Sequence, residues 1–434
     1  MSSALMQGRQ LHFIAIGGAG MSGLALVCHE LGAEVSGSDR AESSYVGRLR
    51  EAGLEPAIGH DAANVPEGAD VVISTAIGDE NVELMAARER GQKVIHRGEL
   101  LAELCSRKRL IAIAGTHGKT TTTAMVVWAL RELGADPAFF IGGELPGAGP
   151  GGEAANAGWG EGEWVIAEAD ESDGSFLELK PEIAVITNVE LDHHSRWTSL
   201  AELRQAFVAF CEPAEAVVAE HGVKLRGVQA FRFGLDEGHT RPHFDLAAPG
   251  RHNALNALAA VGALDRAGFD PGAVEAALCN FPGVARRLEL KGSAKGARIY
   301  DDYAHHPTEV AAALAAARGM TEGRLIAAFQ PHLYSRTKAL ATEFGAALAA
   351  ADEIAVLEVY PAREEPVGEL AGVSGLMVAE AAADHGGGRP VWWLPDAERA
   401  ASALAPRLRS GDLLITLGAG DINKLAEALV EDPA

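Results

Sequence analysis

The sequence contains few cysteines, and it has no long apolar run. Four of its 434 residues are cysteines, and Cys28, Cys105, Cys211 and Cys279 lie far apart without forming a C-x-x-C pair. This spacing excludes a disulfide framework and a cysteine zinc site, so we expect a protein of a reducing cytoplasm. No stretch approaches the roughly 18 apolar residues of a membrane helix, and the N-terminal MSSALMQGRQ lacks a long apolar segment. We therefore expect a cytoplasmic protein without membrane insertion.

Basic residues are also scarce relative to acidic ones. The chain has 37 Lys and Arg residues against 60 Asp and Glu residues, which gives a formal net charge of −23. A surface this negative repels nucleic acid and anionic membranes, so we expect no nucleic-acid partner. An anionic substrate would need hydrogen-bond donors concentrated at its binding site.

Short apolar runs alternate with helical patterns along the chain, which predicts an α/β fold with parallel sheets. The length favours roughly three domains, and we place them at residues 1–107, 108–282 and 283–434. The predicted strands are HFIAI, AEVSGSD, DVVIST and KVIH in the first domain, LIAIA, EWVIAE and EIAVIT in the second, and ARIYDDY, RLIAAFQP, DEIAVLEVY, PVWWLP and DLLITLGAG in the third. Residues 144–162, ELPGAGPGGEAANAGWGEG, lack apolar periodicity and predict a mobile surface loop.

A first glycine-rich turn follows the first predicted strand. It reads Gly18-Ala19-Gly20-Met21-Ser22-Gly23, and Asp39 closes the next strand. In a G-x-G-x-x-G turn the glycines let the backbone approach a pyrophosphate, which also meets the free N–H groups of the helix N-terminus. Taken alone, the turn indicates a nicotinamide dehydrogenase. Any diphosphate ligand would suit it, and a tight turn without a ligand remains an alternative.

A second glycine-rich turn, Gly115-Thr116-His117-Gly118-Lys119-Thr120-Thr121, lies between the strand LIAIA and a helical pattern. It is shorter than the usual G-x-x-x-x-G-K-[ST] loop, but it keeps the groups that act on a triphosphate. Backbone N–H groups can wrap the phosphates, Lys119 can reach the β and γ oxygens, and the Thr120 hydroxyl can bind Mg²⁺. A helix cap with an incidental lysine is the alternative interpretation.

Polar residues end two strands of the second domain. EWVIAEADESD contains Glu168, Glu171 and Asp173, and EIAVITNVELDHH contains His193. Because ligands gather at the carboxyl ends of parallel strands, Glu168 and His193 would join Thr120 at a Mg²⁺ site, although histidine is an unusual ligand for so hard a cation. For Glu171 and Asp173 we expect instead a solvated acidic helix start.

With these motifs in order, the chain resembles the Mur ligases of bacterial cell-wall synthesis. The motifs that carry the resemblance along nearly the whole chain are GGAGMSG, GTHGKTTTT, EADESD, TNVELDH, GRHNALNALAA, FPGVARRLE, DDYAHHPTE, FQPHLYSRT, VYPAREEP and LGAGDINKL. The resemblance implies a Rossmann-like domain for a UDP-sugar, a central P-loop domain for ATP and a Rossmann-like domain for an amino acid. It is greatest to the alanine-adding branch, whose substrates are UDP-N-acetylmuramate and L-alanine.

The resemblance also implies roles for individual residues. The first loop and Asp39 would bind the UDP-sugar, the second loop would bind ATP, and Thr120, Glu168 and His193 would bind Mg²⁺. Further ATP contacts would come from His252, Asn253, Asn256, Arg287 and Asp302. The catalytic and substrate-side groups would be Lys119, Arg287, His305, His306, His332 and Arg336. Histidines satisfied in turns or in a core are the alternative for His305, His306 and His332.

Three features depart from the family pattern. Leu333 stands where many relatives have arginine, Ser195 stands where an aspartate often follows the D-H pair, and residues 231–250 look shorter than usual, as though a hairpin were lost. Ser195 would affect the residues that support the metal ligands, and the short stretch would affect the edge of the central domain. We expect activity to persist, because the implied ATP-site residues flank the short stretch without being deleted.

The implied reaction transfers the γ-phosphoryl of ATP to a carboxylate, and the amine of the amino acid then displaces phosphate from the acyl phosphate. Three alternatives stay open: a recycling ligase that joins a tripeptide to UDP-N-acetylmuramate, a dehydrogenase that binds NAD at the first loop, and a P-loop ATPase or binding module. The last two leave most of the motifs unexplained. A monomer or a homodimer is expected.

Overall fold

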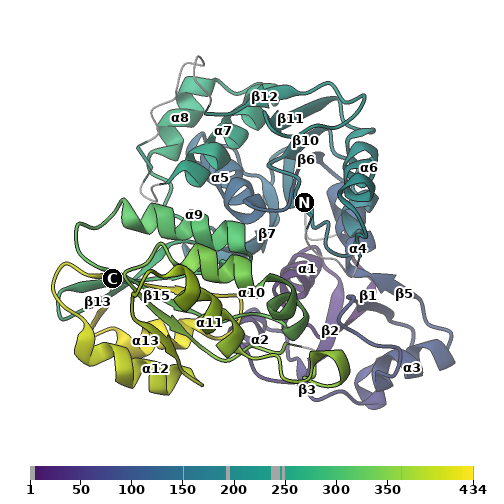
Figure 1. Cartoon of the computed structure of the whole chain (residues 1–434). Helices are drawn as coiled ribbons and strands as arrows, with labels where there is room; N and C mark the ends of the chain where they lie inside the picture. The colour runs from purple at the N-terminus through teal and green to yellow at the C-terminus, as the bar shows by residue number, and fades with distance from the viewer. Residues whose placement is uncertain are drawn as a thin grey trace. The chain divides into compact units, whose positions relative to one another are not determined.

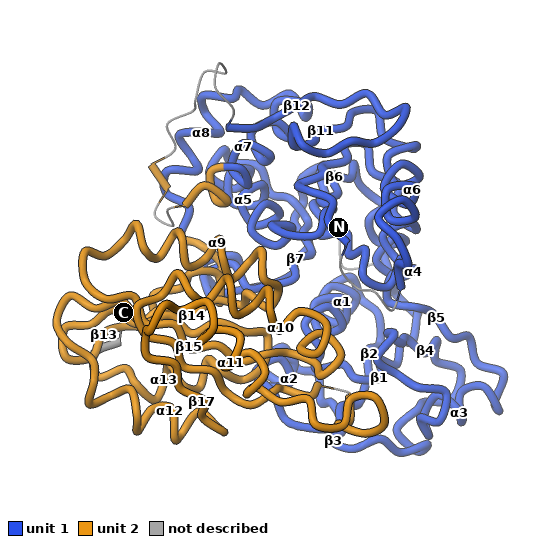
Figure 2. The backbone as a smooth tube through the Cα atoms, viewed as in Figure 1, with its two compact units in different colours: residues 1–244, 255–282 blue, residues 245–254, 283–434 orange. Residues whose placement is uncertain are grey.

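The computed structural model describes residues 5–149, 151–191, 196–235, 245–246, 250–362 and 364–433. The chain divides into two compact units, residues 1–244 with 255–282 and residues 245–254 with 283–434, which Figure 2 shows in different colours. Two sheets lie in the first unit and one in the second. Helices flank mostly parallel strands in both units (Figure 1), so the predicted α/β class is confirmed. No helix within the described ranges is long and apolar enough to cross a membrane.

The first sheet has the strand order β3-β2-β1-β4-β5, with every pairing parallel. Its strands are β1 Gln10–Ile14, β2 Glu34–Asp39, β3 Ala57–Ile58, β4 Asp70–Ile73 and β5 Val94–His96. Its helices are α1 Ala19–Glu30, α2 Ser44–Glu51, the 3₁₀ turn η2 Ala62–Asn64, α3 Val82–Glu89 and α4 Arg97–Cys105. This is the Rossmann-like order, in which ligands bind outside the carboxyl ends of the strands. The first glycine-rich turn lies at this edge: Gly18 caps α1, and Ala19 to Gly23 are the first residues of that helix.

The second sheet has the order β12-β11-β10-β6-β9-β7-β8, with only β8 antiparallel to its neighbour among the described strands. Its strands are β6 Arg109–Ala114, β7 Ala138–Leu145, β8 Ala155–Gly158, β9 Trp164–Glu168, β10 Ile183–Ile186, β11 Ala216–Glu220 and β12 Phe231–Phe233. Its helices are α5 Lys119–Glu132, the 3₁₀ turn η3 Ser175–Glu178, α6 Leu200–Cys211, α7 Arg251–Arg266 and α8 Pro271–Leu278. The central strands β6, β9 and β10 are buried almost throughout, which explains their continuous apolar sequences.

The expectation of a mobile surface loop at residues 144–162 is wrong for Glu144, Leu145 and residues 155–158. Strand β7 continues to Leu145, and residues 155–158 form β8, which pairs with β7. Strand β8 also packs on α1, where the Asn156 side-chain amide donates to the Ala19 carbonyl at 2.7 Å. The sequence did not predict this strand, because its Ala and Gly residues do not produce an alternation of apolar and polar positions. Their small size is what allows α1 to approach so closely.

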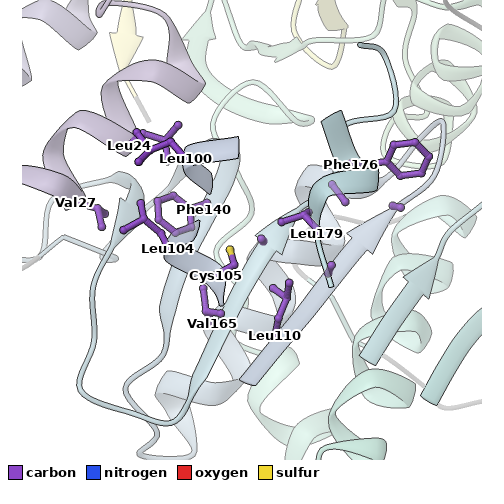
Figure 3. Packing of buried hydrophobic residues seen from close by; sticks show 14 of the residues in the cluster. Leu24, Val27, Leu100, Leu104, Cys105, Leu110, Phe140, Val165, Phe176 and Leu179 are labelled. Atoms are coloured by element: carbon purple, nitrogen blue, oxygen red, sulfur yellow. The ribbon is translucent and has the colours of Figure 1, made fainter. Parts of the chain in front are cut away.

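One hydrophobic core joins the two sheets of the first unit. It contains Leu24 and Val27 of α1, Leu100 and Leu104 of α4, and Phe140 of β7. Figure 3 shows these side chains gathered between the helices and the strand. Because the same side chains pack against both sheets, the first two predicted domains share one hydrophobic core.

The third sheet, in the second unit, has the order β17-β16-β15-β18-β14-β13-β19. Its strands are β13 Glu289–Ala294, β14 Ala297–Asp302, β15 Leu325–Phe329, β16 Glu353–Val356, β17 Val391–Trp393, β18 Leu413–Leu417 and β19 Asp432–Pro433. Its helices are α9 Pro307–Arg318, α10 Tyr334–Leu348, η4 Gly368–Leu370, α11 Gly375–His385, α12 Ala397–Leu404, η5 Ala405–Arg407 and α13 Asn423–Leu429. Strands β14 to β18 pair in parallel, whereas β13 and β19 form an antiparallel edge. Separate hydrophobic clusters cover the two faces of this sheet.

Gly23, the last glycine of the first loop, provides a test of the packing between α1 and β8. A methyl group built on Gly23 would lie 2.9 Å from the Ala157 side chain and 3.3 Å from the Asn156 amide nitrogen. We expect Gly23→Ala to lower the free energy of unfolding by about 1–3 kcal/mol, since overpacking forces β8 away. In contrast, Gly47→Ala in α2 should raise it by about 0.5–1 kcal/mol, because nothing lies near that position and alanine favours a helix. Urea unfolding of both variants measures the difference, and equal effects would contradict this packing.

Candidate active site

The second glycine loop joins β6 to α5 and takes the conformation that its glycines allow. Gly115 and Gly118 have φ values of 136° and 82°, which side chains rarely adopt. A methyl group would also lie 2.1 Å from the Thr187 hydroxyl at Gly115 and 2.4 Å from the Asn256 amide oxygen at Gly118. Both glycines are therefore required for the loop to form, and Asn256 of α7 lies directly against it.

The segment after β10 holds this loop from the side. Thr116 donates to the Glu190 carbonyl, and the His117 N–H donates to the Asn188 amide oxygen, both at 2.9 Å. Thr187 and the Asn188 amide in turn donate to the His117 carbonyl at 2.6 and 2.8 Å. The loop is thus shaped before any ligand arrives, with its backbone groups at the carboxyl ends of β6 and β10.

Lys119, the first residue of α5, is folded back over the loop. Its Nζ donates to the Gly115 carbonyl at 2.7 Å and lies 2.8 Å from the Glu171 carboxylate. Burial alone would lower the pKa of Lys119, but the carboxylates of Glu171, Asp170 and Glu168 outweigh it and raise the pKa. The ammonium is therefore a fixed positive charge at the loop.

The acidic stretch EADESD is not a solvated helix start. Glu171 and Asp173 expose only 2% and 6% of their side chains, and the following residues form the 3₁₀ turn η3. Burial raises the pKa of Glu171 to about 7, against the opposing attraction of Lys119. The expectation for these two residues was wrong because their cationic partners, Lys119 and Arg97, are distant in sequence.

Thr120 and Glu168 meet as the sequence predicts. The Thr120 hydroxyl donates to Glu168 Oε1 at 3.1 Å, and Glu168 Oε2 accepts from the Gly142 N–H at 2.7 Å. A hydroxyl and a carboxylate side by side offer the oxygen donors that Mg²⁺ prefers. The third predicted ligand, His193, lies outside the described residues, as do Asp192, His194 and Ser195. Most of the shortened stretch after β12 also lies outside them.

The first glycine loop lies at the end of β1, and Asp39 at the end of β2 supports it. The Gly17 N–H donates to Asp39 Oδ2 at 2.9 Å. Gly18 is the extended N-cap of α1 and its N–H donates to the Ala15 carbonyl, while Ser22 donates to the Ala19 carbonyl. Within the described residues, Arg97 from the start of α4 contributes a cation beside this loop.

In the second unit, the remaining predicted residues gather at the carboxyl ends of β14 and β15. Asp302 accepts the Leu288 and Ala304 N–H groups, both at 2.8 Å, and burial raises its pKa to about 6 although Arg287 attracts the charged form. The rings of His305 and His332 lie 6.1 Å apart, and the Arg287 guanidinium lies 5.1 Å from the Tyr303 ring.

Four further predicted residues of this region have identifiable environments. His306 caps α9 by accepting the Thr308 N–H, and Arg336 lies in the first turn of α10. His252 and Asn253 begin α7; burial, with Arg287, lowers the pKa of His252, and Asn253 is buried. One ring nitrogen of His306, Nδ1, is thus used to hold the ring at the start of α9.

Leu333 precedes α10 in a strained backbone conformation with φ of 69°. Its N–H donates to the Tyr360 carbonyl at 2.9 Å, which holds the turn in place. The cationic side chain in the following turn is Arg336, which affects the pKa of His305.

Sequence reasoning missed Arg97, Glu171 and Asn188 as parts of the two loops. Each follows a strand at the carboxyl edge of its sheet, and this position was the available signal. Their partners lie roughly 50 to 75 residues away along the chain, so spacing alone did not connect them.

The fold and these loops define a family. Residues 10–109 match the Mur ligase family, catalytic domain; residues 113–221 match the Mur ligase middle domain; and residues 286–420 match the Mur ligase, glutamate ligase domain. The chain belongs to the Mur ligase family, and the resemblance drawn from the sequence motifs is confirmed.

Individual relatives match over nearly the full length. The chain is 45% identical over 452 residues to a UDP-N-acetylmuramate–L-alanine ligase of Kineococcus radiotolerans, covering 95% of this chain and 94% of that protein. It is 43% identical over 471 residues to a ligase of the same name from Mycobacterium sp. strain JLS, covering 97% and 94%. The crystal structure of UDP-N-acetylmuramate–alanine ligase from Thermotoga maritima superposes with a TM-score of 0.84 at 29% identity, covering 97% of this chain and 98% of that one.

His305 gives a prediction about acid stability. Burial, with Arg336 and Arg287, lowers its pKa to about 4, although Glu309 opposes the shift. Between pH 6.5 and 4 the unfolded chain therefore binds a proton that the folded chain does not, and stability falls as the pH falls. We expect this loss to reach about 3 kcal/mol and to disappear in His305→Asn, which cannot be protonated.

Hydrogen exchange of β14 and β15 across this pH range measures the stability of the second unit. The variant His385→Asn, at an exposed position that ends α11, is the control and should follow the unmodified protein. Parallel pH dependences for His305→Asn and the unmodified protein would refute the buried neutral imidazole.

Proposed function

We propose that the protein is an ATP-dependent ligase that joins L-alanine to the lactyl carboxylate of UDP-N-acetylmuramate, releasing ADP and phosphate. The observation that carries this proposal is the pair of glycine loops at the carboxyl edges of two sheets in one unit, each beside a cation that is paired with carboxylates. The full-length identity to ligases of this name supports the choice of substrates.

The loop at Lys119 suits the triphosphate of ATP. Backbone N–H groups and the Lys119 ammonium would hold its oxygens, and Asn256, with His252 and Asn253 of the same helix, would serve the adenine side. Arg287 and Asp302 of the second unit would make further contacts with ATP. Lys119 would stabilise the charge that develops on the transferring phosphoryl group, because a fixed cation needs no reorganisation during the reaction.

Thr120 and Glu168 fit a Mg²⁺ ion, since their oxygens are 3.1 Å apart and both are hard donors. When bound, the ion supplies Lewis-acid stabilisation of phosphoryl charge. His193 would complete the set of protein ligands.

The domain built on the third sheet would bind the amino acid. A carboxylate resists amines because its charge repels them, and formation of an acyl phosphate removes this obstacle. The attacking amine must be unprotonated, and the neutral imidazole of His305 could orient it or accept its proton. His306, His332 and Arg336 would form the rest of this substrate side.

Phosphate release provides the direct test. We expect release from ATP and Mg²⁺ only when UDP-N-acetylmuramate and L-alanine are both present. Release that needs a tripeptide instead of L-alanine would move the protein to the recycling branch. Phosphate release that does not depend on the UDP-sugar would indicate an ATPase without ligase activity and would overturn the proposal.

Two lysines at opposite ends of β6 sharpen this test. Lys119→Met should lower kcat by about 10²–10³-fold or more, because the variant loses the charge that stabilises the transferring phosphoryl group. Lys108→Met is the control, since Lys108 precedes β6 and donates to the backbone of Gly160 at 2.7 Å. Similar losses in both variants would place the effect in folding rather than at the site.

Glu168 gives a second prediction at this site. Glu168→Gln should raise the Mg²⁺ concentration required for half-maximal phosphate release by about tenfold or more, because a neutral amide binds hard cations more weakly than a carboxylate. Glu163→Gln, at the exposed position just before the same strand β9, should leave the Mg²⁺ requirement unchanged. An unchanged requirement in Glu168→Gln would exclude Glu168 as a ligand.

A further inference from the structure

Arg97 lies between the first glycine loop and the acidic loop that follows β9. It begins α4 and exposes a quarter of its side chain. One terminal nitrogen, Nη2, makes both of its ion pairs: it donates to Asp170 at 3.0 Å and to Asp173 at 2.9 Å. Two carboxylates thus hold the guanidinium in a fixed orientation.

The other terminal nitrogen, Nη1, faces the first glycine loop. A methyl group built on Gly20 would lie 3.1 Å from it, so the guanidinium is in contact range of the loop backbone. Among the described residues, no side chain or carbonyl accepts a hydrogen bond from Nη1. A guanidinium has five N–H donors in a rigid plane, so donors remain for an anion at this loop.

The surroundings keep Arg97 charged and fixed. Burial would lower the pKa of Arg97, but Asp170 and Asp173 outweigh it and raise the pKa. Asp170 in turn accepts the Ser172 N–H at 3.0 Å through its other oxygen, which fixes the carboxylate. A positive charge held this way can bind an anion without first being ordered, which lowers the entropic cost of binding.

We propose that Arg97 binds the diphosphate of the UDP-sugar through Nη1, while Asp170 and Asp173 position its guanidinium. The inference rests on the proposed function, because it assigns the nucleotide-sugar to the first loop. The diphosphate is the anion that fits, since Nη1 lies beside Gly20, in the turn where the backbone of α1 begins. Asp170 and Asp173 are positioning residues in this arrangement and do not contact the ligand.

Binding of UDP tests this assignment, because UDP carries the diphosphate but no lactyl carboxylate. We expect Arg97→Lys to weaken UDP binding by about 10–100-fold in isothermal titration calorimetry. Lysine keeps the positive charge, but its single nitrogen cannot pair with both aspartates and also reach the diphosphate. Binding of UDP-N-acetylmuramate should weaken by a similar factor, with KM raised and kcat nearly unchanged.

Arg48→Lys is the matched control. Arg48 lies in α2 and pairs with Glu144 of β7, so it links the same two sheets, and it is not among the atoms within 4 Å of a methyl group built on Gly20. It should keep the affinity for UDP, and both variants should keep a melting temperature close to that of the unmodified protein. A loss of affinity in both variants would assign the effect to the contact between the sheets and overturn the proposal.

Two other results would also overturn it. Unchanged UDP affinity in Arg97→Lys would remove Arg97 from the site, and a loss confined to UDP-N-acetylmuramate would place Arg97 at the carboxylate instead. Failure of the unmodified protein to bind either ligand would overturn the proposed function itself, so the two failures are distinguishable. Asp173→Asn should raise the KM for the UDP-sugar several-fold with an unchanged kcat, as expected of a positioning residue.

Discussion

The buried ammonium of Lys119 is the constraint on which the arrangement of this site depends. A charge removed from water must be neutralised nearby, because an unpaired one costs several kcal/mol. Glu171 lies 2.8 Å away, and Asp170 and Glu168 add their negative charges. These charge interactions hold the loop after β9 against the loop after β6. The position of Lys119 therefore determines where the acidic side chains lie.

This acidic loop also reaches the first sheet. Lys119 and Arg97 outweigh burial and hold the pKa of Asp170 well below its usual range, so one carboxylate faces the cations of both glycine loops. A triphosphate bound at Lys119 would add negative charge beside Glu168, Asp170 and Glu171. A divalent cation at Thr120 and Glu168 would reduce this repulsion, so the proposed metal ion would add to the charge that the lysine supplies.

The sequence was sufficient to predict the features that are encoded locally. Buried parallel strands such as β6 and β10 read as continuous apolar runs, and the glycines of the second loop mark the two positions that only glycine can occupy. Thr120 and Glu168 could be paired because Glu168 ends the strand β9 and Thr120 follows the parallel strand β6. The order of the motifs then identified the family, because ten motifs in one order are far more specific than any one of them.

Features made by long-range packing could not be predicted in this way. Asn156 and Ala157 belong to a segment without apolar alternation, yet they form a strand because Gly23 leaves room for them against α1. The sequence alone predicts a solvated side chain for Glu171, because it does not show that Lys119 lies beside it. In the same way, the sequence does not show that Arg97 is paired with Asp170 and Asp173. In each case the sequence shows one partner of a close contact, and only the fold supplies the other. A G-x-G-x-x-G turn therefore does not by itself reveal its ligand: here its last glycine serves packing, while its chemistry depends on an arginine more than seventy residues further along the chain.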